Sequence, residues 1–205
     1  MARIYEAMTK VAAIILAAGR GSRMGSNDKL LSPYQGRPLL AAIIDAAEAS
    51  KAAQIILVTG YKSELLSPLV EGRNITQIDN PLFDEGMSSS IKAGLAALDD
   101  TMDGAMICLA DMPLLTHLHL DALISAFDGN VCAPVFNDKR GNPVLWGRKH
   151  FAALQALAGD KGARDILKTM ENEITLVKMD DDATLVDVDT PEALKALVEK
   201  ANSGE

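Results

Sequence analysis

A loop rich in glycine and basic residues carries the first chemical signal in this chain. Residues 16–29 read Leu-Ala-Ala-Gly-Arg-Gly-Ser-Arg-Met-Gly-Ser-Asn-Asp-Lys and directly follow an apolar run. Glycine lets the backbone turn so that several N–H groups point toward one guest. Arg20, Arg23 and Lys29 add positive charge to the same segment. Backbone donors beside mobile cations suit a triphosphate, so the loop predicts nucleotide chemistry.

Two well-known phosphate-binding loops do not match this segment. The dinucleotide fingerprint Gly-x-Gly-x-x-Gly fails because Met24 stands where its third glycine should follow Gly19 and Gly21. The P-loop fails because it requires Gly-Lys-Ser/Thr, whereas Gly25 is followed by serine. The segment is therefore either a phosphate-binding loop of another kind or a glycine-rich turn with solvated arginines.

Acidic residues near the ends of two later segments are candidate metal ligands. Asp111 follows an apolar run, and a carboxylate that faces a phosphate loop is a natural Mg²⁺ ligand, although it could also cap a helix or stabilise a turn. Asp187 and Asp189 form an Asp-Val-Asp segment, and alternation along an extended chain places both on one face. Asp189 is a second metal ligand or a residue that caps the final helix, and the sequence leaves both open.

The segment Glu85-Gly-Met-Ser-Ser-Ser90 is a further candidate contact with a nucleotide. Gly86 permits a close approach of the backbone, and the hydroxyls of Ser88 and Ser89 can bind a ligand or cap the helix that follows. No serine here has a convincing His/Asp partner, so the sequence does not indicate nucleophilic catalysis by serine.

Composition and charge exclude several classes of function. The 205 residues carry a net charge of −8, which argues against nucleic acid or an anionic membrane as the main partner. No apolar run approaches 18 residues, and residues 1–10 form an N-terminal extension without the apolar core of a signal peptide. Cys108 and Cys132 lie in apolar runs and indicate buried thiols in a reducing compartment, so we expect a cytoplasmic protein without a zinc site.

Apolar runs alternate with helical periods, which predicts an α/β fold with a mostly parallel sheet and helices on both faces. The runs that read as strands are Ala12–Leu16, Ile55–Val58, Ile75–Ile78, Ala105–Leu109, Val131–Val135, Val144–Trp146 and Ile174–Lys178. Thr116 and Thr190 are expected to cap helices. Ligands of such sheets bind at the carboxyl ends of the strands, where Thr59, Gly60 and Asn80 also fall.

Taken in order, these segments resemble the MobA/MocA-like nucleotidyltransferases, which make molybdenum-cofactor dinucleotides. The similar pieces extend over residues 11–198. They are Leu16–Gly25 with Lys29, Gly86–Ser90, Leu109–Pro113, Arg140–Val144, Gly159–Arg164 and Asp187–Pro191.

The resemblance implies a three-layer, Rossmann-like nucleotidyltransferase fold in a single domain over residues 11–200. Its nucleotide-binding part would span 11–133 and its acceptor-binding part 134–186, closed by 187–201. Leu-Ala-Ala-Gly and Gly-Met-Ser-Ser-Ser look like the cytidylyl branch of the family rather than the guanylyl branch. The implied reaction is Mg²⁺-dependent transfer of CMP from CTP to molybdopterin, with a molybdenum hydroxylase as a possible client. Alternatives are guanylyl transfer and another small phosphate acceptor, such as a sugar 1-phosphate.

The resemblance also implies roles for individual residues. It implies Mg²⁺ on Asp111 and contacts of the loop and Lys29 with the triphosphate. From their charges we expect Arg23, Lys29 and Asp111 to be the catalytic residues, and Asp189 stays a candidate for the second metal ligand. Acceptor binding falls on Gly141, Asn142 and Pro143, although the family commonly has Gly-His-Pro at that point. The expected nucleotide-binding residues are Leu16, Ala17, Ala18, Gly19, Arg20, Gly21, Lys29, Thr59, Gly60, Asn80, Gly86, Ser88 and Ser89.

Overall fold

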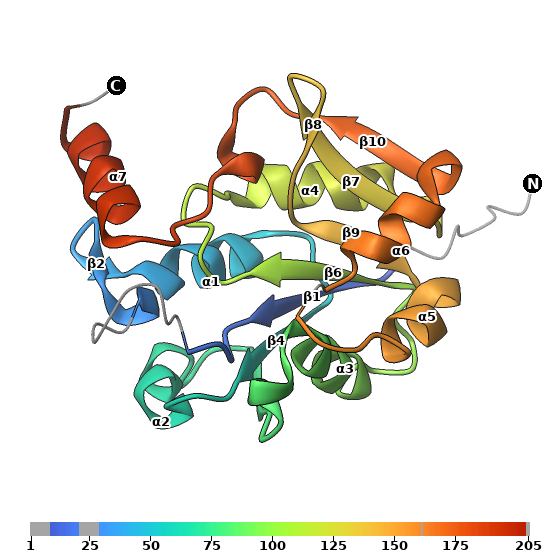
Figure 1. The fold of residues 1–205 in the computed structure, drawn as a ribbon, viewed down its shortest axis with the longest axis horizontal. Helices are drawn as coiled ribbons and strands as arrows, with labels where there is room; N and C mark the ends of the chain where they lie inside the picture. Colours follow the sequence, from blue (N-terminus) through green and yellow to red (C-terminus); the bar gives the residue numbers. More distant parts are fainter. Residues whose placement is uncertain (1–8, 21–28, 161, 204–205) are drawn as a thin grey trace, which may run out of the picture.

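A mostly parallel sheet with helices on both faces forms the centre of the protein (Figure 1). The computed structural model describes residues 9–20, 29–160 and 162–203. The strands of the sheet lie in the order β10-β7-β9-β6-β1-β4-β5, and β8 pairs with β7 at one side. Their bounds are β1 Val11–Leu16, β4 Gln54–Thr59, β5 Thr76–Asp79, β6 Gly104–Leu109, β7 Val131–Phe136, β8 Lys139–Arg140, β9 Val144–Gly147 and β10 Ile174–Lys178.

The predicted strands are confirmed to within one residue at each end. One feature that the apolar runs do not reveal is the direction of β9, which pairs antiparallel with both β6 and β7. The other long strands pair in parallel, as in β1 with β4 and β6. The sheet is therefore mixed, and its parallel strands place their carboxyl ends at one edge.

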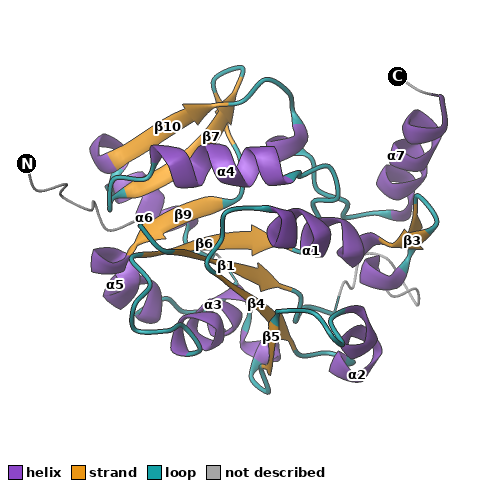
Figure 2. Cartoon of the chain, turned by 180° about the vertical axis from the view of Figure 1, so that it is seen from behind, coloured by secondary structure: helices purple, strands orange, loops and turns teal. Residues whose placement is uncertain are grey.

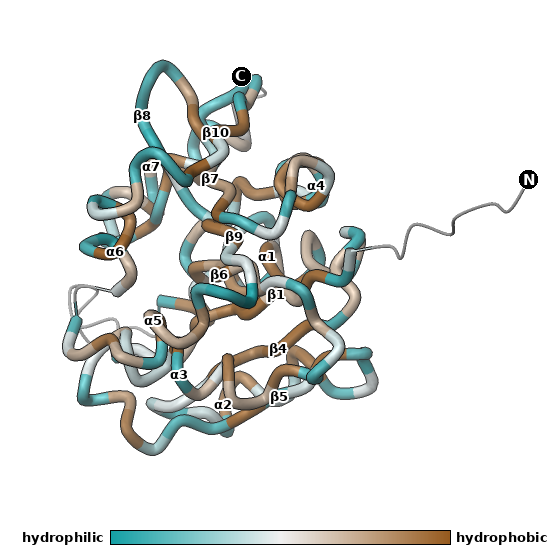
Figure 3. The backbone as a smooth tube through the Cα atoms, turned by 90° about the vertical axis from the view of Figure 1, so that its right-hand side faces the viewer, coloured by the Kyte–Doolittle hydropathy of each residue, from teal (hydrophilic) through white to brown (hydrophobic). Residues whose placement is uncertain are grey.

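Side chains of β1 point alternately to the two faces of the sheet and contribute to a separate hydrophobic core on each face. Val11, Ala13 and Ile15 pack on one face with α1 (Leu39–Ala49) and α4 (His117–Ala126). Ile14 packs on the other face with residues of α3 (Met87–Ala96), α5 (Phe151–Gln155) and α6 (Arg164–Thr169). Figure 2 shows α1 and α4 in front of the sheet, and Figure 3 shows the hydrophobic colouring concentrated in the central strands.

The helix caps follow the sequence expectations. Thr116 and His119 form a capping box at the start of α4, which satisfies backbone N–H groups that the first turn leaves unpaired. The final helix α7 runs over Pro191–Ser203, and the Thr190 hydroxyl accepts a hydrogen bond from the Ala193 N–H. After β9 the chain forms a 3₁₀ turn, Arg148–His150, followed by the short helix α5.

A small antiparallel ribbon and α7 form a third apolar cluster beside the sheet (Figure 1). The ribbon consists of β2 (Pro33–Tyr34) and β3 (Arg37–Pro38). Buried Tyr34 and Leu39 pack there with Val188 and Leu197 from the C-terminal segment. The cluster therefore joins the end of the chain to the segment that follows the glycine-rich loop.

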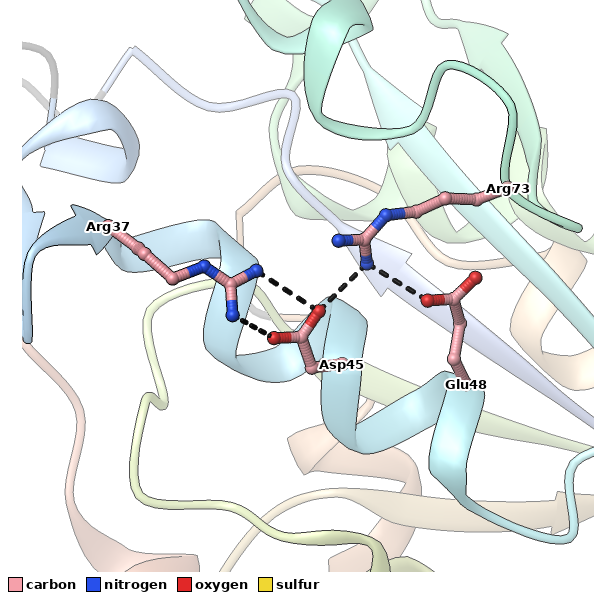
Figure 4. Close-up of polar contacts among 4 residues, drawn as sticks. All are labelled: Arg37, Asp45, Glu48 and Arg73. Carbon is pink, nitrogen blue, oxygen red and sulfur yellow. Dashed lines mark hydrogen bonds and ion pairs between the residues drawn. The ribbon is translucent and has the colours of Figure 1, made fainter.

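An ion-pair network ties the same region to the other edge of the sheet. Asp45 of α1 receives hydrogen bonds from Arg37 and Arg73, and Arg73 also contacts Glu48 at 2.9 Å (Figure 4). Burial raises the pKa of Asp45, but the hydrogen bonds and charges of the two arginines outweigh it and hold that pKa below its usual value. The short helix α2 (Ser63–Leu66) lies near this edge (Figure 2). Within the described residues, no helix has both the length and the apolar character to cross a membrane.

Candidate active site

Three carboxylates from two distant segments meet at the carboxyl edge of the sheet. Asp111 lies two residues after β6, while Asp187 and Asp189 precede α7. One oxygen from each of the three side chains lies within 4.8 Å of the others. The expectation that alternation places Asp187 and Asp189 on one face agrees with this arrangement, and it brings in Asp187, to which the sequence assigned no metal-binding role.

Lys29 lies between two of these carboxylates. Its Nζ is 2.6 Å from Asp111 Oδ2 and 2.8 Å from Asp189 Oδ1, and the residue is only 8% exposed. Lys29 begins a 3₁₀ turn, Lys29–Leu31, whose next residue Leu30 packs against the third apolar cluster. The ammonium group is therefore held among the acids by packing as well as by charge.

The backbone fixes the Asp-Val-Asp segment against the loop after β6. The N–H of Val188 donates to the carbonyl oxygen of Asp111 at 2.9 Å, and the Val188 side chain is 1% exposed. Since neighbouring side chains of an extended segment point to opposite sides, burial of Val188 turns its two acidic neighbours toward Asp111.

The electrostatics of this cluster favour a further cation. Burial raises the pKa of Asp187, the charges of Asp111 and Asp189 raise it further, and Lys29 opposes them. Asp111 Oδ1 is buried and has no hydrogen-bond partner among the described residues. Hard carboxylate oxygens, one of them lacking a partner, are the donors that a divalent cation such as Mg²⁺ prefers. The residues present therefore fit a divalent metal ion.

A cleft of about 580 Å³ opens beside the carboxylates. Its walls include the main chain that follows β1, the start of α3 and the Asp-Val-Asp segment. Of the residues expected at the site, those that line this cleft are Leu16, Ala17, Ala18, Gly19, Arg20, Lys29, Gly86, Asp111, Asn142 and Asp189. Arg23 and Gly21 lie outside the described residues.

Arg20 is held at the mouth of the cleft by Asp84. Its Nε and Nη2 donate to the two carboxylate oxygens at 2.8 and 2.7 Å. The guanidinium carbon also lies 5.3 Å from the Tyr61 ring centroid and 5.4 Å from that of Phe83. The paired contact raises the pKa of Arg20 and lowers that of Asp84. Sequence analysis did not single out Asp84, because nothing nearby in the chain marks it as a partner of Arg20.

Five of the expected nucleotide-binding residues do not line this cleft: Thr59, Gly60, Asn80, Ser88 and Ser89. The Asn80 amide, 3% exposed, donates to the hydroxyls of Ser89 and Ser90. The Thr59 hydroxyl donates to the carbonyl oxygen of Ile78. These polar side chains connect the ends of β4 and β5 to α3, directly behind the cleft wall.

Gly86 allows the chain to pass close to a later segment. Its φ is +97°, and an added Cβ would lie 2.7 Å from the Gly159 carbonyl carbon and 2.8 Å from the Asp160 nitrogen. The Ser88 N–H donates to the Gly159 carbonyl oxygen at 3.2 Å. The start of α3 and the segment around Asp160 are thus in direct backbone contact.

A second cleft of about 520 Å³ lies next to the first. Gly141 and Asn142 line it, whereas Pro143, which follows a cis peptide bond, does not. Arg140, Asp160 and Arg164 line it as well, and none of the three was assigned a role from the sequence. Their signal was present in the pieces Arg140–Val144 and Gly159–Arg164, which the sequence shares with nucleotidyltransferases.

A family model described as "MobA-like NTP transferase domain" matches residues 13–174. The chain belongs to this family. It is 29% identical over 186 residues to the molybdenum cofactor cytidylyltransferase of Escherichia coli (strain K12), covering 90% of this chain and 94% of that protein. It is also 27% identical over 197 residues to nicotine blue oxidoreductase of Paenarthrobacter nicotinovorans, covering 92% and 96%.

Among solved structures, this MobA-like chain is similar to Rv0371c of Mycobacterium tuberculosis H37Rv in a complex with manganese. The TM-score is 0.78 at 25% identity, and the match covers 93% of this chain and 99% of that chain. The similarity confirms the α/β nucleotidyltransferase fold.

Proposed function

We propose that this MobA-like protein transfers CMP from CTP to the phosphate of molybdopterin and releases pyrophosphate. The observation that carries the proposal is the contact of buried Lys29 with Asp111 and Asp189 inside the first cleft. The Leu-Ala-Ala-Gly sequence at 16–19 and the similarity to the E. coli cytidylyltransferase support cytidine as the nucleotide and molybdopterin as the acceptor.

Asp111 and Asp189 are the proposed metal ligands, and we add Asp187 to the proposal because its carboxylate lies close to theirs. A divalent cation at this site, for which Mg²⁺ is the proposal, would offset the negative charge of the phosphates. Lys29 is proposed to offset the same charge, because it lines the first cleft, where the triphosphate is proposed to bind. Ala18 and Gly19 line the adjoining wall, and their backbone N–H groups are the proposed donors to the phosphates, since the N–H of Ala17 already donates to Val58.

In the proposed reaction an oxygen of the acceptor phosphate forms a bond to the α-phosphorus of CTP. The bond from that phosphorus to the bridging oxygen breaks, and the electron pair leaves with pyrophosphate. The attacking phosphate is already anionic near neutral pH, so no general base is required, and none of the described residues that line the first cleft is a histidine. The protein aligns two polyanions and reduces their repulsion. Arg23, which lies outside the described residues, is proposed to assist Lys29 in stabilising the leaving group.

The second cleft is the proposed acceptor site, because it adjoins the first and contains Gly141 and Asn142. The acceptor is the part of the proposal that rests most on similarity. Guanylyl transfer and a different small phosphate acceptor keep the same chemistry at Lys29 and Asp111. An alternative that is not an enzyme is a protein that binds a nucleotide without transferring it and carries cofactor to a client hydroxylase.

A matrix of assays separates these possibilities. Pyrophosphate release is measured with CTP or GTP, each with molybdopterin or a sugar 1-phosphate, in the presence of Mg²⁺. We expect release with CTP and molybdopterin only. Pyrophosphate release with GTP would mean that the nucleotide substrate is GTP rather than CTP. Release with the sugar 1-phosphate would mean that the acceptor is not molybdopterin. Nucleotide binding with no release in any combination would reject the transferase. A parallel assay with nicotine blue as the substrate tests the activity named for the relative from P. nicotinovorans.

A further inference from the structure

The two clefts share one wall, which is formed by five residues from four segments of the chain. These residues are Met87, Leu109, Asn142, Asp160 and Arg164. A molecule in the second cleft therefore meets a molecule in the first at this wall. Transfer of a nucleotidyl group requires such a meeting, because the attacking oxygen must reach the α-phosphorus within contact distance.

Arg164 is the cation at this junction. It is exposed at the start of α6, and it forms no ion pair with any residue that the structure describes. The other two described cations of the second cleft already have acidic partners. Arg140 lies 3.6 Å from Glu171, and Lys168 lies 3.0 Å from Asp165. Asp160 is the acidic group of the wall, and its carboxylate lies against Gly86 at the start of α3.

The floor of the second cleft is apolar. Ile107 of β6 and Val144 and Trp146 of β9 contribute to it, and all three are buried. A ligand that fits this cleft combines a weakly polar group over the floor with an anionic group at the junction. The planar guanidinium of arginine binds phosphate through two parallel hydrogen bonds.

We propose that Arg164 binds the phosphate of the acceptor and presents its oxygen to the α-phosphorus of the nucleotide. The acceptor class is a phosphate monoester whose remaining part packs on the apolar floor of the second cleft. This inference rests on the proposed transferase function and adds to it a residue that contacts substrate.

The first test compares Arg164→Ala and Arg164→Lys with the native protein in the pyrophosphate assay, at varied CTP and varied molybdopterin. Loss of a charged hydrogen-bonding group predicts a rise in the acceptor KM of about tenfold or more for Arg164→Ala. The KM for CTP stays within twofold, and Arg164→Lys recovers part of the loss. An unchanged acceptor KM, or an equal rise in the KM for CTP, overturns the proposal. Lys195→Ala, at an exposed position of α7, is the control and keeps native values.

The second test does not need transfer activity. Trp146 is the only tryptophan of the chain and lines the second cleft, so its fluorescence reports on a ligand there. The probe is phenyl phosphate, titrated with CTP saturating the first cleft. We expect binding to the native protein that weakens at least fivefold in Arg164→Ala. Equal binding to both proteins, or none to the native protein, overturns the role of Arg164. Absence of pyrophosphate release in the native protein rejects the proposed function instead, and the titration then decides on Arg164 alone.

Discussion

Lys29 and Asp111 are 82 positions apart in the chain, and their charged groups lie 2.6 Å apart. The contact follows from sheet order, because β1 and β6 are neighbours with Leu16 opposite Leu109. The segments that leave these two strands emerge side by side. Lys29, at the end of the glycine-rich loop, thus reaches Asp111, which follows β6.

Replacement of Lys29 is expected to separate metal binding from catalysis. In Lys29→Met three carboxylates lose their described neutralising cation, so Mg²⁺ or Mn²⁺ binds more tightly than to the native protein. Turnover falls about 10²-fold or more, because the ammonium group no longer stabilises the leaving pyrophosphate. Calorimetric titration with the metal and the pyrophosphate assay measure the two effects. Unchanged metal affinity would contradict this account, and Lys51→Met, at an exposed position, is the control.

Replacement of Asp111 is expected to impair both properties. Asp111→Asn keeps the size of the side chain but removes the charge that faces Lys29, so metal affinity falls and turnover falls about 10²-fold or more. Chelation of the metal with EDTA is expected to abolish turnover of the native protein, and added Mg²⁺ restores it. Near-normal turnover of Asp111→Asn would remove this residue from the mechanism.

Arg20 is expected to bind the nucleotide more readily once Asp84 is neutralised. Both side chains are more than half exposed, so their ion pair is screened by solvent and its loss leaves the fold intact. If Arg20 leaves Asp84 to contact the triphosphate, Asp84→Asn lowers the KM for CTP by a small factor and Arg20→Ala raises it. The pyrophosphate assay at varied CTP measures both. A rise in KM with Asp84→Asn would show instead that Asp84 holds Arg20 in its working position.

Much of the fold could be predicted from the sequence, because buried parallel strands read as short apolar runs. β6 is a clear case, because its residues are almost all buried and the predicted bounds Ala105–Leu109 differ by one residue from the observed Gly104–Leu109. The antiparallel direction of β9 could not be predicted, since Val144–Gly147 is buried on both faces, as are the parallel strands at the centre of the sheet. The two-residue strands of the β2–β3 ribbon are too short for any periodicity to show.

The contact between the start of α3 and residue 160 is testable at Gly86. Gly86→Ala suffers two penalties: a backbone at φ +97° and ψ −177° that is essentially restricted to glycine, which costs about 1 to 3 kcal/mol, and a clash with Gly159 and Asp160. Gly129 has a similar φ of +90° with no atom within 4 Å of an added Cβ, so Gly129→Ala carries only the first penalty. Chemical denaturation should therefore show a larger loss for Gly86→Ala. Equal losses of unfolding free energy in the two variants would mean that the segment around residue 160 shifts to accommodate the added Cβ at no energetic cost.

The two cysteines are expected to be unreactive in the folded protein. Burial raises the pKa of Cys108 to about 12, and burial together with the charge of Asp128 raises that of Cys132 to about 11. A thiol reagent at pH 8 should then label neither in the native protein and both after denaturation. Labelling of native protein at a rate near that of a free thiol would contradict the burial.

The same shifts define a range of pH in which stability declines. A raised pKa in the folded state leaves stability intact below the unfolded value near 9, and stability is lost as pH rises toward 11 and 12. Denaturation curves at pH 8 to 11 measure the decline. A variant with Cys108→Ala and Cys132→Ala should show a shallower dependence on pH, whatever its stability at pH 8.

The candidate site was predictable where its residues stand at strand ends, as with Asp111, and not where it depends on partners across the fold. Nothing in the sequence pairs Arg20 with Asp84, because they meet only through the packing of β1 beside β4 and β5. The choice between metal ligand and helix cap for Asp189 could be made only once the position of α7 was known. The structure places its carboxylate on Lys29 and leaves capping to the Thr190 hydroxyl.

The placement of Asp189 at the side of Asp111 bears on how the protein is made. A ribosome that has delivered the chain as far as β7 has supplied Lys29 and Asp111 but not the acids that precede α7. Two of the three clustered acids are therefore missing until synthesis is almost over. A nascent chain cannot assemble this charge cluster early, and chains interrupted before residue 187 would contain Lys29 and Asp111 but lack those two carboxylates.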